Sequence, residues 1–128
     1  MPEILVLIVE DDALIQLELE NALHGGGYST IAEVSGEKAI ARLESDQNVR
    51  ALITDINLQR EISGWDVARR ARELFPDLPV VYVTSVAAEE WTSQGVPKSI
   101  LIPKPFAPAQ ITTAISQLLN ATDTPPSP

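Results

Sequence analysis

The chain of 128 residues contains no cysteine, a single histidine and few cations. Without cysteine there is no disulfide framework, no thiolate nucleophile and no zinc-ribbon spacing, and this composition fits a reducing compartment, so the cytoplasm is the default location. Lysine and arginine together number 9 against 18 aspartate and glutamate residues, which gives a net charge of −9. This charge repels phosphate backbones and anionic membranes, so neither nucleic acid nor membrane is an expected partner.

The beginning of the chain also lacks the features of an export signal. Met1-Pro2-Glu3 contains no basic residue, and the apolar run that follows at residues 4–9 is too short to span a membrane. We therefore expect a soluble protein that is not exported. The length suits one domain, which we expect at residues 1–120, and the polar, proline-rich segment 121–128 predicts a disordered tail.

Two apolar runs in the chain end in carboxylates. Residues 4–9 lead directly into Glu10-Asp11-Asp12, and residues 51–54 lead into Asp55. Short apolar runs rich in branched residues predict strands that are buried on both faces. An aspartate after a strand is often only a turn former or a helix N-cap, so Asp55 by itself identifies no site.

Further short apolar runs alternate with helical patterns along the chain. The runs predict three more strands, at residues 28–34, 79–83 and 99–102. Helices are predicted after Asp12, after Ser35, from Gly64, at residues 87–94 and around residues 111–119. This alternation predicts an α/β fold, with a doubly wound, flavodoxin-like, five-stranded parallel sheet in the order 2-1-3-4-5 and five helices.

The predicted strand order gathers polar side chains at one edge of the sheet. Strands one and three lie side by side, so Glu10, Asp11 and Asp55 converge, and Thr84 and Lys104 follow the next two strands. Crowded carboxylates repel one another unless a cation lies among them, and oxygen ligands without a nearby histidine favour Mg²⁺. Lys104 and Thr84 can contact phosphoryl oxygens, and an aspartate oxygen can attack phosphorus to form an acyl phosphate. Each residue alone has an ordinary structural explanation, but together they favour a phosphoryl site.

The motifs at these strand ends resemble those of a known family. They are Val9-Glu10-Asp11-Asp12 after the first strand, Asp55 after the third, Thr84 after the fourth and Lys104-Pro105-Phe106 after the fifth. Over residues 4–119 the chain resembles a response-regulator receiver domain of two-component signalling, of the stand-alone, single-domain type. The resemblance implies a phosphoacceptor that assists its own phosphoryl transfer and dephosphorylation, and not an enzyme with a separate substrate.

The resemblance also implies roles for the acidic residues. Asp55 would accept the phosphoryl group from a phosphohistidine on a sensor histidine kinase or a histidine phosphotransfer protein. Mg²⁺ would be bound by Asp55, directly by Asp11, through water by Glu10, and by the backbone carbonyl of Asn57. The cofactor expected from the resemblance is therefore the same ion that the oxygen-only ligand set favours.

The remaining site residues and the output face follow from the same resemblance. Thr84 would donate a hydrogen bond to the phosphoryl group, and Lys104 would pair with it. The peptide bond before Pro105 is a candidate for the cis form, which has a modest cost only before proline. Output would pass to a downstream protein target, or by phosphate relay or a phosphate sink. We expect a monomer or a weak homodimer through helix four, strand five and helix five.

The chain departs from the family pattern at several positions. Family members commonly carry an aromatic residue three positions before the lysine, where this chain has Leu101. Tyr82 either substitutes in that switch or packs its ring in the core. Trp91 is either an exposed anchor for a partner or a buried packing residue. After Asp55, Leu58-Gln59 stands in place of the usual Met-Pro pair, which points to an unusual choice of partner.

Three other function classes fit parts of the pattern. A phosphatase of the haloacid-dehalogenase type needs a second aspartate two residues after the first, where this chain has Asn57. A flavodoxin-like nucleotide binder needs glycine or hydroxyl donors after the first strand, where this chain has Glu10-Asp11-Asp12. A receiver-like interaction scaffold that works without phosphorylation stays open as the alternative, because Leu101 favours it mildly while the complete site opposes it.

Overall fold

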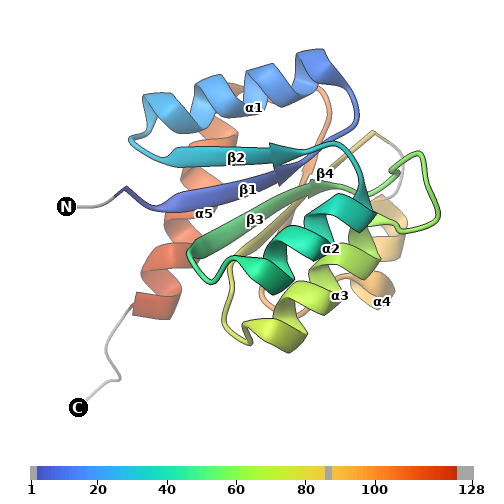
Figure 1. Ribbon diagram of the computed structural model, residues 1–128. Helices are drawn as coiled ribbons and strands as arrows, with labels where there is room; N and C mark the ends of the chain where they lie inside the picture. Colours follow the sequence, from blue (N-terminus) through green and yellow to red (C-terminus); the bar gives the residue numbers. More distant parts are fainter. Residues whose placement is uncertain (1–2, 86–87, 124–128) are drawn as a thin grey trace.

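Strands and helices alternate along the whole chain (Figure 1). The structure is a computed structural model, and it describes residues 3–85 and 88–123. Its elements in chain order are β1 (Leu5–Val9), α1 (Ala13–Gly25), β2 (Ser29–Glu33), α2 (Gly36–Ser45), β3 (Val49–Asp55), α3 (Gly64–Leu74), β4 (Val80–Thr84), a 3-10 turn (Ala88–Glu90), α4 (Trp91–Gln94), β5 (Ser99–Pro103) and α5 (Pro108–Asp123).

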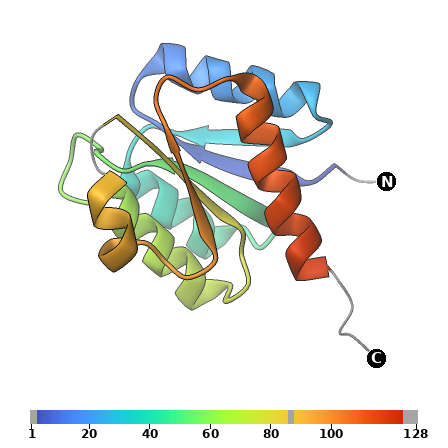
Figure 2. The same ribbon diagram turned by 180° about the vertical axis from the view of Figure 1, so that it is seen from behind.

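The five strands form one parallel sheet in the order β2-β1-β3-β4-β5. Figures 1 and 2 show α1 and α5 on one face of this sheet and α2, α3 and α4 on the other. The predicted fold class, strand order and parallel pairing are therefore confirmed. In a doubly wound sheet of this kind the carboxyl ends of all strands meet at one edge, where ligands bind.

The central strands are buried on both faces, as their apolar runs predict. Val6, Leu7, Ile8 and Val9 of β1 have no exposed surface, and β4 is buried along its whole length. Successive strand residues point to opposite faces, so Leu7 and Val9 pack with α2 and α3, whereas Val6 and Ile8 pack with α1 and α5. The edge strand β2 is only half-buried.

Side-chain caps determine where three helices begin. The Asp12 carboxylate accepts hydrogen bonds from two backbone N–H groups in the first turn of α1. Ser35 caps α2, and α3 begins with a capping box between Ser63 and Asp66. Each cap of this kind stabilises a helix by about 1 kcal/mol. The helix starts predicted after Asp12 and Ser35 are confirmed.

The prediction of a helix at residues 87–94 is partly wrong. Only Trp91–Gln94 is α-helical, and it follows a 3-10 turn at Ala88–Glu90; residue 87 lies outside the described residues. No side chain caps the start of α4, and none of its four residues is buried. A short helix with neither a cap nor a buried face has little to stabilise further turns.

The end of the domain also differs from the prediction. α5 continues to Asp123, so residues 121–123 of the expected tail are helical, and residues 124–128 lie outside the described residues. The helix can extend because no proline interrupts the chain between Pro108 and Pro125. Even with this added length, no helix in the described ranges combines the span and the apolar content that a membrane crossing requires.

Candidate functional site

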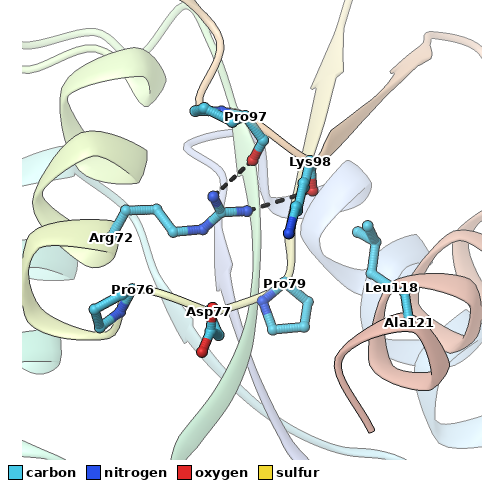
Figure 3. A pocket seen from close by; sticks show the side chains of 8 residues that line it. All are labelled: Arg72, Pro76, Asp77, Pro79, Pro97, Lys98, Leu118 and Ala121. Atoms are coloured by element: carbon cyan, nitrogen blue, oxygen red, sulfur yellow. Dashed lines mark hydrogen bonds between the residues drawn. The ribbon is translucent and has the colours of Figure 1, made fainter. Parts of the chain in front are cut away.

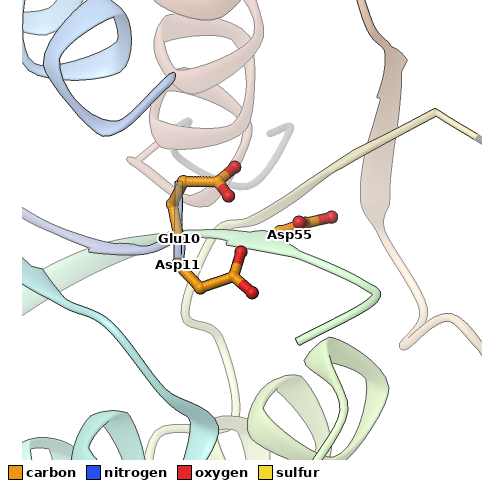
Figure 4. A group of neighbouring side chains, drawn as sticks. All are labelled: Glu10, Asp11 and Asp55. Atoms are coloured by element: carbon orange, nitrogen blue, oxygen red, sulfur yellow. The ribbon is translucent and has the colours of Figure 1, made fainter. Parts of the chain in front are cut away.

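The carboxyl ends of β1 and β3 bring three carboxylates together. The two strands are neighbours, with Val9 opposite Thr54, so the residues that follow them are adjacent. One carboxylate oxygen of each of Glu10, Asp11 and Asp55 lies within 4.8 Å of the other two (Figure 4). Glu10 is only 1% exposed and Asp55 7%, whereas Asp11 is half-buried. Two of the three charges are thus largely withdrawn from water.

Lys104 joins this cluster from the end of β5. Its Nζ atom lies 3.1 Å from Glu10 Oε1 and 3.2 Å from Asp55 Oδ2. The backbone N–H of Lys104 donates to the carbonyl of Thr84 at 2.8 Å, and the peptide bond between Lys104 and Pro105 is cis. The loop after β5 is therefore held to the end of β4 while its lysine reaches the two acids.

The pKa values of Glu10 and Lys104 reflect this crowding. Burial raises the pKa of the Glu10 carboxyl to about 7, and the charge of Asp55 adds to the rise, although the Asp12 backbone N–H and the Lys104 ammonium oppose it. Burial alone lowers the pKa of Lys104, but Asp55 and Glu10 outweigh it, and the net pKa is above its ordinary value. The pKa values of both groups are raised, which means that additional positive charge among these carboxylates would be favourable.

The two adjacent acids after β1 differ in their contacts. Glu10 uses both carboxylate oxygens, because Oε1 contacts Lys104 and Oε2 accepts a hydrogen bond from the backbone N–H of Asp12 at 3.1 Å. Within the described residues the Asp11 carboxylate makes neither a hydrogen bond nor an ion pair. Asp11 is therefore the acid of this pair with oxygens available to a cation.

Backbone packing around Asp55 fixes the third acid. The hydroxyl of Thr54 donates to the Asp55 carbonyl at 2.8 Å. Gly64 begins α3 directly against the same strand end, because its N–H donates to the Ile56 carbonyl at 2.9 Å and an added Cβ would lie 2.0 Å from the Asp55 carbonyl oxygen. The sequence predicts Gly64 only as a helix start. A glycine immediately after the Ser63 cap was the available signal.

The two other residues predicted for the site, Thr84 and Asn57, lie at or just after the carboxyl ends of β4 and β3. Thr84 ends β4 and is 1% exposed, and Asn57 follows Asp55 by two residues with an exposed side chain. The structure thus brings Glu10, Asp11, Asp55 and Lys104 into one group of contacts. The roles of Thr84 and of the Asn57 carbonyl stay predictions.

The predicted switch residues lie on the α3 and α4 side of the sheet. Tyr82 has no exposed surface, its ring centroid lies 4.7 Å from that of Trp65, and its hydroxyl accepts the Val96 N–H at 3.0 Å. Leu101 is half-buried and pairs with Tyr82 across β4 and β5. Trp91 is 37% exposed, and its indole N–H donates to Ser99 at 2.9 Å. In this structure, then, Tyr82 packs in the core, and Trp91 is partly exposed.

The donor set fits a magnesium ion. Mg²⁺ prefers oxygen ligands and typically uses one or two carboxylates together with waters and phosphoryl oxygens. Glu10, Asp11 and Asp55 offer carboxylate oxygens that lie close enough to share one ion, and Lys104 alone leaves these acids with excess negative charge. The site therefore offers oxygen ligands suited to a hard divalent cation, and such a cation would neutralise its excess negative charge.

Comparison with known proteins identifies the family. A family model described as the response regulator receiver domain matches residues 6–116 of the chain. The chain belongs to this family. As a receiver domain it is a module of two-component signalling, in which receiver domains pair with sensor kinases or phosphotransfer proteins. The family suggested by the strand-end motifs is thereby confirmed.

Curated relatives of this receiver domain include both short and long proteins. The response regulator receiver protein CpdR of Brucella abortus is 31% identical over 91% of this chain and 97% of its own length. The regulator PhyR of Methylorubrum extorquens is 31% identical over 89% of this chain, which spans only 43% of that protein. The sensor kinase CckA of Brucella abortus is 28% identical over 92% of this chain, which spans 13% of the kinase.

Solved structures show the same receiver fold. A response regulator receiver protein from Sinorhizobium medicae WSM419 is 44% identical and superposes with a TM-score of 0.92, covering 94% of this chain and 98% of that one. A putative response regulator from Chloroflexus aurantiacus J-10-fl is 28% identical with a TM-score of 0.82, covering 92% and 98%. The flavodoxin-like architecture is therefore shared along nearly the full length.

Proposed function

We propose that Asp55 is the phosphoacceptor of this receiver domain and takes a phosphoryl group from a phosphohistidine on a sensor histidine kinase or a histidine phosphotransfer protein. The observation that carries this proposal is the position of the Lys104 ammonium, 3.2 Å from Asp55 Oδ2 and beside two further acids. A carboxylate oxygen held next to a cation can attack phosphorus while the cation neutralises the incoming phosphoryl oxygens.

The bond changes in this transfer balance without another reactant. An oxygen of the Asp55 carboxylate attacks phosphorus, and the phosphorus–oxygen bond forms as the phosphorus–nitrogen bond of the phosphohistidine breaks. The imidazole nitrogen keeps the electron pair, and because the other ring nitrogen retains its proton, the histidine leaves as a neutral ring. The receiver thus acts as a phosphoacceptor that assists its own modification, and not as an enzyme with a separate substrate.

Asp11, Asp55 and the backbone carbonyl of Asn57 are the proposed direct ligands of Mg²⁺. Glu10 is the proposed ligand through water, because its two oxygens already contact Lys104 and the Asp12 N–H. When bound there, Mg²⁺ would neutralise charge on the phosphoryl oxygens. The three acids hold this position before the phosphoryl group arrives, so binding requires little rearrangement of the strand ends.

Lys104 and Thr84 are the proposed partners of the phosphoryl group after transfer. Lys104 already lies between Glu10 and Asp55, so a small movement of its ammonium would pair it with a phosphoryl oxygen. The buried Thr84 hydroxyl at the end of β4 would donate to another oxygen. The backbone N–H of Lys104 donates a hydrogen bond to the Thr84 carbonyl, so the ends of β4 and β5 that carry these two residues are held together. The phosphorylated domain would then contact a downstream partner protein, or pass its phosphoryl group on as a phosphate relay or sink. It would be a monomer or a weak homodimer through α4, β5 and α5.

The direct test is the mass of the intact protein after incubation with acetyl phosphate or a phosphorylated kinase and Mg²⁺. We expect the wild type to gain one phosphoryl group, Asp55→Asn to gain none, and removal of Mg²⁺ to abolish the gain. Asp77→Asn, an exposed aspartate at the other end of the sheet, is the matched control and should behave as wild type. A wild type that gains no mass would support the phosphorylation-independent scaffold instead.

A further inference from the structure

A cavity lies at the opposite end of the sheet from Asp55. It has a volume of about 610 Å³. The residues that line it are Arg72, Pro76, Asp77, Pro79, Pro97, Lys98, Leu118 and Ala121. Pro79 directly precedes β4 and Lys98 directly precedes β5, so the cavity sits at the amino-terminal ends of strands whose carboxyl ends lead to Thr84 and Lys104. Its volume falls in the range of small-molecule sites.

Arg72 is held rigidly at this cavity by backbone carbonyls. Its Nε donates to the Leu78 carbonyl at 2.7 Å. Its two terminal nitrogens donate to the carbonyls of Pro97 at 2.6 Å and Lys98 at 3.3 Å (Figure 3). These bonds use three of the five N–H donors of a guanidinium. The other two N–H donors make no hydrogen bond within the described part of the chain.

The charge of Arg72 also lacks a direct counter-charge. Arg69 and Arg70 on the same helix each form an ion pair with a carboxylate, whereas in the described residues no carboxylate lies within ion-pair distance of Arg72. Burial lowers the pKa of the Arg72 guanidinium below its ordinary value, although Tyr82 and Asp77 oppose this. A partly buried cation bonded only to neutral carbonyls is a binding point for an anion.

Lys98 adds a second cation in an unusual backbone conformation. Its φ angle is +59°, in the left-handed region that favours glycine and asparagine over a residue such as lysine. In this conformation its carbonyl accepts from Arg72, and its ammonium forms no ion pair in the described ranges. Lys98 therefore brings a second positive charge to the cavity wall.

The remaining walls indicate the shape and charge of a ligand. Three proline rings and Leu118 provide rigid apolar surface. Asp77 is the single acid among the lining residues and offsets one of the two cations, which leaves one positive charge on a protein whose overall charge is −9. One uncompensated positive charge beside apolar walls matches a singly charged anion with a compact apolar body.

We propose that this cavity binds a small organic monoanion, a carboxylate on a compact apolar body, with the carboxylate against Arg72 and Lys98 and the apolar body against the prolines and Leu118. Binding there does not depend on phosphorylation of Asp55. A bound ligand would contact the turn before β5, because Pro97 and Lys98 belong both to the cavity wall and to that turn.

The test is an NMR titration of the full chain with phenylacetate, followed on the backbone amides. We expect saturable shifts at Asp77, Leu78, Lys98 and Ser99 with a dissociation constant of about 1 mM. Phenylethanol, which has the same ring without the charge, should shift these amides little. Absence of saturable shifts with phenylacetate up to about 10 mM, or equal shifts with phenylethanol, overturns the proposal.

Substitution of Lys98 separates binding from folding. Asparagine tolerates the left-handed conformation, so Lys98→Asn should keep or raise the melting temperature while it weakens phenylacetate binding about fivefold. Lys38→Asn, at an exposed lysine on α2, is the matched control and should bind as wild type. If Lys98→Asn unfolds, Lys98→Gln provides the same comparison. Wild-type affinity in a folded Lys98 variant contradicts the proposed site.

Discussion

At the scale of single residues, the charge balance at Glu10 governs the site. Its carboxyl is buried between a second acid, Asp55, and one lysine, Lys104, and its pKa is raised to about 7. A glutamate in an unfolded chain titrates near 4.5. Between these two values the folded protein holds a proton that the unfolded chain has already released, so the folded state loses relative stability as the pH rises.

The first prediction concerns this pH dependence in the absence of Mg²⁺. The free energy of unfolding of the wild type should fall as the pH rises from about 5 to about 8, with Glu10 contributing on the order of 2 kcal/mol. Glu10→Gln keeps acceptor oxygen for Lys104 but cannot ionise, so its stability should depend less on pH in this range. Urea unfolding of both proteins at the two pH values measures the difference. If the free energies of unfolding of the two proteins changed equally with pH, Glu10 would not be the titrating group.

At the scale of secondary-structure elements, the position of Asp55 depends on how α3 begins. The first residue of this helix, Gly64, lies against the backbone of Asp55 and Ile56, where an added Cβ would meet the Asp55 carbonyl oxygen at 2.0 Å. Backbone atoms cannot move aside as a flexible side chain can. Any larger residue at position 64 must therefore displace either the helix or the strand end that carries Asp55, the proposed phosphoacceptor.

The second prediction follows from this contact. Gly64→Ala should lower the free energy of unfolding by about 3 kcal/mol and slow phosphorylation of Asp55. Gly25→Ala is the matched control, because no atom lies within 4 Å of its added Cβ, and its stability should be unchanged or raised by up to about 1 kcal/mol. Chemical denaturation of the two variants and the wild type provides the measurement. Equal effects at both glycines would show that the contact does not constrain the fold.

The third prediction concerns the link between β4 and the turn after α4. Tyr82→Phe removes the hydroxyl that accepts the buried Val96 N–H, so the free energy of unfolding should fall by about 1–3 kcal/mol and the Val96 amide should exchange hydrogen faster. Tyr28→Phe removes a hydroxyl from a half-buried contact with Ser116 and should cost less than about 1 kcal/mol. Hydrogen exchange together with denaturation distinguishes the two. An unchanged Val96 amide in Tyr82→Phe would refute the link.

At the scale of the whole molecule, a cluster of acids and a cavity lined by two cations lie at opposite ends of the sheet. The carboxyl ends of the strands collect the acids Glu10, Asp11 and Asp55, whereas the cavity at the amino-terminal ends of β4 and β5 presents Arg72 and Lys98. The proposed ligands differ accordingly: Mg²⁺ and a phosphoryl group at the acidic end, and a small organic anion at the cavity. A ligand that binds only the folded state at either end stabilises the entire domain, because folding and binding are linked.

The fourth prediction uses this linkage. Mg²⁺ with beryllium trifluoride, a mimic of the phosphoryl group, should stabilise the wild type by about 3 kcal/mol at a hundredfold excess over its dissociation constant. Asp55→Asn, which lacks the acceptor carboxylate, should gain little. Thermal unfolding in the presence and absence of the mimic gives the comparison. The same rise in melting temperature in both proteins would argue against Asp55 as the acceptor.

Part of the site was accessible from the sequence because its signals are local. The apolar runs before Glu10 and Asp55 predict buried strands, and alternation with helices predicts the strand order that places these acids side by side. The short α4 and the extension of α5 were harder to predict, since a helix end depends on capping and packing that periodicity does not report.

By itself, the sequence determined the fold class, the family motifs and the set of acids, hydroxyl and lysine that meet at one sheet edge, because strand and helix periods and residue chemistry are encoded locally. Only the tertiary structure decided that Lys104 reaches both Glu10 and Asp55, that Gly64 abuts the Asp55 backbone, and that Arg72 and Lys98 share a cavity. The distances in these contacts depend on how the helices and loops pack against the sheet, which local sequence patterns do not report.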